Sequence, residues 1–142
     1  MRPINEIIVH CTATRASWWS SRSLGQKIAE VRKWHVNERG WSDIGYHFLI
    51  DRNGKVGAGR PLHKVGAHVV GHNSGTIGIS LFGGYEAAAS DNFMENFTSA
   101  QDAALRQLIQ DLRSRFSINR ITGHNQYANK ACPGFSVGAW YA

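Results

Sequence analysis

The chain has 142 residues, of which 42% are hydrophobic and 11% aromatic. That length and composition suit one ordinary folded domain with a buried core. No apolar run approaches the ~18 residues of a membrane span, so we expect no stable membrane insertion. The formal net charge of +6 favours anionic partners such as a cell wall. Because the basic residues are scattered, nucleic acid is not an expected partner.

The N-terminal segment MRPINEIIVHC has no basic region followed by a long apolar region, and therefore no recognisable signal peptide. We expect the protein to be made and folded in a cytoplasm. The sequence contains only two cysteines, which give no disulfide framework. In a reducing compartment, a cysteine near histidines is more often a metal ligand or a catalytic group than a disulfide partner.

The first two predicted elements are a strand and a helix. The run EIIVHCT is β-branched and apolar, which predicts a buried strand. Ser23 and Gln26 have the spacing of a capping box, which predicts the start of a helix that runs to about Glu38 and ends at Gly40. The apolar face of this helix has four residues at helical spacing: Leu24, Ile28, Val31 and His35.

Strands and a second helix are predicted in the middle of the chain. Two strand-like runs flank Asn53-Gly54, a pair typical of a type I′ hairpin turn. The next run, GTIGISLFGGY, predicts a strand whose glycines indicate a close approach to the backbone, either by a bound peptide or by a helix packed tightly on the sheet. Thr98 and Gln101 repeat the capping-box spacing at the start of a second long helix. Its apolar face comprises Leu105, Leu108, Ile109, Leu112 and Phe116.

The C-terminal part predicts a short strand in INRITGH, ending at His124, and a helical turn in SVGAWYA with Trp140 docked on the body. The resulting order β-α-β-β-β-α-β predicts an α/β fold, with a central mixed sheet of about five strands flanked by helices. The sequence shows no linker and no internal repeat. We therefore expect a single domain over residues 1–142, without a separate cell-wall-binding domain.

Two histidines and a cysteine are candidates for a metal site. Zinc sites use nitrogen and thiolate sulfur in a tetrahedral arrangement, and catalytic ones leave one position for solvent. His10 ends the first strand, and the loop between His124 and Cys132 is long enough to fold back. Cys11 should point to the opposite face of the strand from His10 and lie in the core. From spacing alone, metal ligation and ordinary packing or hydrogen bonding both remain open for these side chains.

Four motifs follow one another in an informative order: IIVHCTAT, RKWHVNERGWSDIGYHFLIDRNGKVGAGRP, VGAHVVGHNSGTIGISLFGGY and ITGHNQYANKACPGF. In this combination the chain resembles the type 2 N-acetylmuramoyl-L-alanine amidases, the family shared with peptidoglycan recognition proteins. It is most similar in style to the small phage lysozymes that are amidases. The resemblance covers roughly residues 6 to 140. It implies a hydrolase that cleaves the amide between N-acetylmuramic acid and the L-alanine of the peptidoglycan stem peptide.

The resemblance also implies one Zn²⁺ per chain, with His10, His124 and Cys132 as its ligands. It implies catalytic roles for Tyr46, in the motif DIGY, and for Lys130, two positions before the cysteine. We expect both to stabilise the negative charge that develops on the amide carbonyl when hydroxide attacks. The general base stays open, because no glutamate lies beside a ligand as it does in an HExxH protease.

Three further residues are candidates for substrate binding: His68, Asn73 and His35. His68 and Asn73 match positions where the family lines its substrate groove. His35 is expected either to support the site by hydrogen bonding or to pack in the core. Trp18 and Trp19 form an unusual pair in a polar loop, where they either grip glycan or a membrane surface, or cap the sheet edge.

The function we expect is that of a phage or prophage endolysin. The protein would be a monomer, synthesised in the host cytoplasm without a signal peptide and active on periplasmic peptidoglycan after release. The alternative is a non-catalytic peptidoglycan-binding module; such family members typically have a changed cysteine position, whereas Cys132 is intact here. Regulatory binding to an RNA polymerase, known for some small phage amidases, is not expected because the chain before the first strand is very short.

Overall fold

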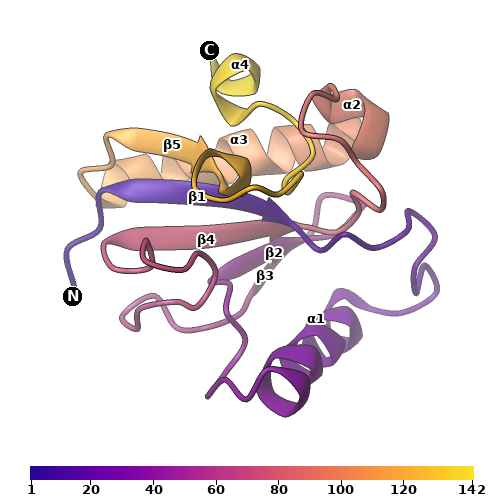
Figure 1. The fold of residues 1–142 in the computed structure, drawn as a ribbon, viewed down its shortest axis with the longest axis horizontal. Coiled ribbons are helices and arrows are strands. Elements are labelled where there is room, and N and C mark those ends of the chain that lie inside the picture. The colour runs from indigo at the N-terminus through magenta and orange to yellow at the C-terminus, as the bar shows by residue number, and fades with distance from the viewer.

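A five-stranded mixed sheet in the order β3-β2-β4-β1-β5 forms the centre of the fold, which the computed structural model describes for residues 1–142 (Figure 1). The strands are β1 (Glu6–Cys11), β2 (Phe48–Ile50), β3 (Val56–Ala58), β4 (Thr76–Leu81) and β5 (Arg120–Gly123). β1 pairs in parallel with both β4 and β5, and β2 pairs in parallel with β4. Only β3, at one edge, runs antiparallel to its neighbour. The predicted α/β class with a mixed sheet is confirmed.

Two long helices and two short ones accompany the sheet: α1 (Leu24–Lys33), α3 (Ser99–Arg115), α2 (Phe93–Asn96) and α4 (Val137–Tyr141). In Figure 1, α3 lies behind the sheet near β1 and β5, and α1 lies toward β2 and β3. No helix combines the length and the apolar character needed to cross a bilayer.

The two faces of the sheet bury different side chains, because neighbouring residues of a strand point to opposite faces. Ile7, Val9 and Cys11 of β1 belong to the larger core cluster, together with residues of α3. Leu49 of β2 belongs to a smaller cluster on the side of α1. The predicted burial of Cys11 is therefore confirmed, and His10 is directed to the face opposite α3.

Both predicted capping boxes are present. The Ser23 hydroxyl accepts the Gln26 backbone N–H, while the Gln26 side chain accepts the Ser23 backbone N–H. Thr98 and Gln101 form the same pair of hydrogen bonds at the start of α3. The first helix differs from the prediction in its last turn, η1 (Trp34–Glu38), which is π-helical. Such turns are frequent at functional sites.

The connection between β2 and β3 is not the predicted type I′ turn. Such a turn requires a positive φ at both central residues, but of Asn53 and Gly54 only Gly54 has one, at 87°. The loop is wider, since the Asp51 N–H donates to the Lys55 carbonyl at 2.9 Å. Asn53 accepts the Lys55 N–H through its side chain. That local side-chain bond stabilises the wider turn without a left-handed asparagine.

The C-terminal region follows the prediction with one shift. β5 ends at Gly123, and His124 begins a short 3₁₀ turn, η2 (His124–Gln126). α4 is the predicted terminal helical turn. The Trp140 ring stacks on Phe93 with a centroid distance of 5.6 Å, and its indole N–H donates to Asp102 at 2.7 Å. The expected docking of Trp140 is confirmed.

Lys27 and Asp51 form a buried ion pair with a nitrogen–oxygen distance of 2.7 Å and side-chain exposures of 4% and 7%. Lys27→Met should lower the free energy of unfolding by about 3–5 kcal/mol, because it leaves the Asp51 carboxylate buried and uncompensated. Urea unfolding followed by circular dichroism measures the loss.

Arg32→Met is the matched control for this prediction. The Arg32–Asp43 pair is 42% and 31% exposed, and such surface pairs contribute about 1 kcal/mol or less. Equal losses in the two variants would show that burial does not set the strength of the Lys27 interaction.

Candidate functional site

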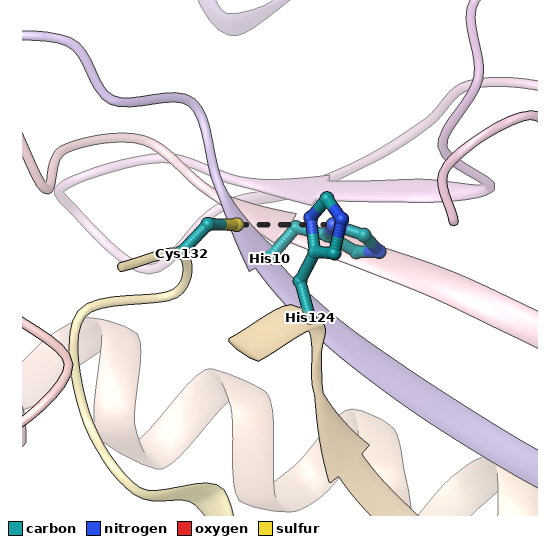
Figure 2. Close-up of side chains that lie close together, drawn as sticks. All are labelled: His10, His124 and Cys132. Carbon is teal, nitrogen blue, oxygen red and sulfur yellow. Dashed lines mark hydrogen bonds between the residues drawn. The ribbon is translucent and has the colours of Figure 1, made fainter. Parts of the chain in front are cut away.

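Two histidines and a cysteine from distant parts of the sequence converge at one edge of the sheet (Figure 2). His10 comes from β1, His124 from the start of η2, and Cys132 from the loop before α4. Their candidate ligand atoms all lie within 4.8 Å of one another, and His10 Nδ1 is 3.8 Å from the Cys132 sulfur. The group is therefore compact enough to share one metal ion.

The sheet itself places the two histidines. Val9 pairs with Gly123 in the parallel register of β1 and β5, so the residues that follow, His10 and His124, lie side by side at the carboxyl ends of the strands. Ligand sites of open α/β sheets are found at this edge. The Cys11 backbone N–H donates to the Cys132 sulfur at 3.3 Å, which holds the C-terminal loop against the end of β1.

The donor set fits zinc. Two imidazole nitrogens and a thiolate suit Zn²⁺, and three protein ligands leave a fourth position open, as in catalytic zinc sites. Burial lowers the pKa of His10 well below its usual value and also lowers the pKa of His124, so both rings are neutral near neutral pH. The neighbouring Cys11 thiol and burial raise the pKa of the Cys132 thiol, so we expect metal binding to release its proton.

A groove of about 260 Å³ opens beside this candidate metal centre. It is lined by the candidate ligand His124 and by every residue that the sequence analysis assigned to catalysis or substrate binding: His35, Tyr46, His68, Asn73 and Lys130. The structure thus brings all of these side chains to one place. Their individual roles in catalysis and binding stay predictions.

Tyr46 lies close to both the candidate metal centre and η1. Its ring centroid is 5.2 Å from that of His10 and 5.4 Å from that of His35. Burial, followed by the nearby cysteine thiols, raises the pKa of Tyr46. The phenol therefore keeps its proton at neutral pH and is able to donate a hydrogen bond. Lys130 is exposed and lies in the loop between the two C-terminal ligand positions.

His35, in η1, is buried and has one ring nitrogen engaged, because the Gly45 N–H donates to its Nδ1 at 2.9 Å. Burial, followed by Arg39 and Arg60, lowers the pKa of His35 to about 4. The neutral ring therefore carries its proton on Nε2. The ring supports the loop before Tyr46 through this hydrogen bond and also lines the groove, which agrees with the interpretation of His35 as a support of the site.

His68 and Asn73 belong to one turn in the wall of the groove. The Asn73 side-chain oxygen accepts the backbone N–H groups of His68 and Val69 at 2.9 and 2.8 Å. The His68 ring is buried, with Nδ1 at 2.8 Å from His10 Nε2. This contact with a candidate ligand is one that the sequence analysis did not anticipate.

Two further site residues were missed from the sequence. Arg39 lines the groove and also a neighbouring cavity of about 260 Å³ that reaches Trp34 and Glu38. Thr76 begins β4, and its hydroxyl contacts His68. Neither residue lies in a pattern with a recognised chemistry, and the π-helical turn that ends just before Arg39 leaves no clear sequence signal.

Trp18 and Trp19 stack on each other with a centroid distance of 5.0 Å. Trp18 also stacks on Phe82 of the smaller core cluster, at 5.9 Å, whereas Trp19 is 36% exposed. Neither ring lines the groove. This arrangement supports the packing interpretation for Trp18. Of the two rings, Trp19 is the one exposed enough to contact glycan or a membrane surface.

The region that carries this site matches a known protein family. The family model described as N-acetylmuramoyl-L-alanine amidase covers residues 1–135. The chain belongs to the N-acetylmuramoyl-L-alanine amidase family. The resemblance inferred from the four sequence motifs is thereby confirmed.

Individual members of the amidase family and its relatives are similar over nearly the whole chain. The endolysin of Klebsiella phage KP32 is 41% identical over 137 residues, which cover 96% of this chain and 85% of that protein. Peptidoglycan-recognition protein SC2 of Drosophila melanogaster is 34% identical over 133 residues, or 92% and 68% of the two chains. The solved structure of the N-acetylmuramoyl-L-alanine amidase LysC from Clostridium intestinale superposes with a TM-score of 0.72 at 32% identity, covering 94% of this chain and 78% of that one.

The buried histidines predict a loss of stability in acid. Burial lowers the pKa of His35 and of His47 from 6.5 to about 4. Below pH 6.5 the unfolded chain takes up protons on these rings, whereas the folded chain does so only near pH 4. The free energy of unfolding that the neutral rings contribute above pH 6.5 is therefore lost progressively as the pH falls toward about 4. Urea-unfolding midpoints of the metal-free chain should fall over this interval.

His47→Gln provides the control for the pH dependence. A glutamine amide is able to replace the two hydrogen bonds of the ring, one accepted from the Gly78 N–H and one donated to the Lys64 carbonyl. This variant should lose less stability than the unsubstituted chain over the same interval. An unchanged pH dependence would mean that His47 is not one of the groups responsible.

Proposed function

We propose that the chain is a zinc-dependent phage or prophage endolysin, which hydrolyses the amide bond between N-acetylmuramic acid and L-alanine in peptidoglycan. Membership of the amidase family establishes a peptidoglycan-related substrate. The observation that carries the proposal is the complete set of His10, His124 and Cys132 beside a groove that also contains Tyr46 and Lys130.

Each residue of the site has a distinct task in this proposal. When bound by His10, His124 and Cys132, one Zn²⁺ per chain would act as a Lewis acid and make hydroxide available near neutral pH. The Tyr46 hydroxyl and the Lys130 ammonium group line the same groove as hydrogen-bond donors. They would stabilise the negative charge that develops on the amide carbonyl oxygen.

The leaving amine also needs a proton. No aspartate or glutamate lines the groove. Tyr46, Lys130 and His35 are titratable residues that line the groove beside the candidate ligands. His35 contributes an N–H on Nε2, because its Nδ1 is occupied by the Gly45 N–H.

A non-catalytic peptidoglycan-binding module is the second candidate, since a peptidoglycan-recognition protein is among the relatives. Recognition alone requires neither three converging metal ligands nor a source of hydroxide. The intact ligand set, with Lys130 beside it, therefore favours the enzyme.

For the cellular setting, we propose synthesis in the host cytoplasm and action on periplasmic peptidoglycan after release. The protein would work as a monomer, at the junction of glycan and stem peptide, without stable membrane insertion. The net charge of +6 would favour its approach to an anionic envelope.

Removal of zinc and removal of the hydrogen-bond donors Tyr46 and Lys130 should affect zinc content and hydrolysis differently. A chelator should abolish dye release from labelled peptidoglycan, and added zinc should restore it. Lys130→Ala and Tyr46→Phe should each lower kcat by about 100-fold or more with zinc content unchanged, because one oxyanion donor contributes ~3 kcal/mol. Dye release and atomic emission spectrometry provide the two measurements.

Lys64→Ala is the matched control, because Lys64 is an exposed lysine outside the groove. It should hydrolyse peptidoglycan at the unsubstituted rate. Normal hydrolysis by Lys130→Ala would exclude its catalytic role. A zinc-loaded chain that binds peptidoglycan without cleaving it would identify a recognition module instead.

A further inference from the structure

A continuous row of hydrogen bonds runs from the candidate metal centre to the start of β4. His10 Nε2 lies 2.8 Å from His68 Nδ1, and His68 Nε2 lies 3.2 Å from the Thr76 hydroxyl oxygen. That hydroxyl oxygen lies 2.9 Å from the Asn73 carbonyl oxygen and 3.1 Å from the His72 carbonyl oxygen. His10, His68 and Thr76 are only 1%, 7% and 3% exposed, so solvent does not replace these bonds.

The last link sets the direction of every proton in the row. A carbonyl oxygen only accepts, so Thr76 donates its single hydroxyl proton there and accepts the His68 Nε2–H. A neutral imidazole carries one N–H, so His68 Nδ1 is a lone pair that accepts the His10 Nε2–H. His10 is then left with a lone pair on Nδ1, the atom 3.8 Å from the Cys132 sulfur.

Two glycines fix the position of the His68 ring. A Cβ at Gly78 of β4 would lie 2.7 Å from His68 Cγ, and a Cβ at Gly66 would lie 2.8 Å from His68 Cδ2. Both distances are far inside van der Waals contact, so only glycine at these positions leaves room for the ring. The sequence analysis expected a bound peptide or a packed helix near the glycines of β4, but the neighbour of Gly78 is the His68 ring, which lies in a loop.

We propose that His68 and Thr76 are positioning residues that hold His10 in the tautomer required for metal binding. Without the Thr76 oxygen, the His68 Nε2–H would be buried without an acceptor, and the proton would favour Nδ1. His68 would then donate to His10 Nε2 and force the His10 proton onto Nδ1, the atom on the side of the Cys132 sulfur. Partners of this kind typically change metal affinity by about 10–100-fold. The proposal rests on the proposed function only in taking zinc as the ion.

Nitrogen-15 NMR of the imidazole groups tests the proton order without any substitution. The full chain is measured metal-free and after zinc loading. Both His10 and His68 should show the Nε2–H tautomer. An Nδ1–H tautomer at either ring would overturn the proposal, whatever the hydrolytic activity of the sample.

Zinc affinity, measured by competition with a chelator, provides a second test. Thr76→Val should weaken zinc binding by about 10–100-fold, whereas Thr76→Ser keeps the hydroxyl and should retain the affinity. Gly78→Ala should also weaken zinc binding, because its methyl group displaces the His68 ring. Gly138→Ala in α4 is the matched control, since a Cβ there meets nothing within 4 Å.

A double-mutant cycle separates positioning from a general loosening of the site. In a His68→Ala chain, Thr76→Val should change zinc affinity less than about 2-fold, because the two residues act in series. An equal further loss in that background, or an unchanged affinity in Thr76→Val alone, would overturn the proposal. If the unsubstituted chain binds no zinc, the proposed function fails, and the tautomers seen by NMR still decide the proton order.

Discussion

The parallel pairing of β1 with β4 on one side and β5 on the other is the constraint on which the whole site depends. It brings His10 and His124 to the same edge of the sheet, because the residues before them are paired in register. A slip of β1 by one residue would turn His10 into the core beneath α3 and present Cys11 to the groove. The apolar residues Ile7 and Val9, buried against α3, make such a slip unfavourable.

One face of the sheet packs the larger apolar core, and the other carries the candidate site. The face toward α3 is a continuous apolar cluster that extends to Phe135 and Val137 near the C-terminus. The opposite face buries polar groups, and two of its histidines are hydrogen-bonded: His47 to backbone, His68 to His10 and Thr76. Hydrogen-bonded polar networks of this kind are rigid. Rigidity is what a metal centre requires of the side chains that hold it.

The parts of the fold that could be predicted have local signals. Capping boxes and apolar spacing located both long helices, and β-branched runs located the central strands. The predicted type I′ turn at Asn53-Gly54 was wrong, because a side-chain hydrogen bond that the sequence pattern does not reveal favours a wider loop. Spacing alone left metal ligation open for His10, His124 and Cys132, and only the family resemblance, carried by the order of the motifs, made them the predicted ligands. The link between His68 and His10 spans 58 positions, so no local pattern reveals it.

Metal content per chain tests the central claim most directly, with the unsubstituted chain and Cys132→Ser dialysed against zinc and then against buffer. Circular dichroism confirms that both remain folded. The convergence of three ligands on one ion predicts one zinc per unsubstituted chain and a clear deficit in Cys132→Ser. No bound zinc in the folded, unsubstituted chain, or a full complement in Cys132→Ser, would contradict it.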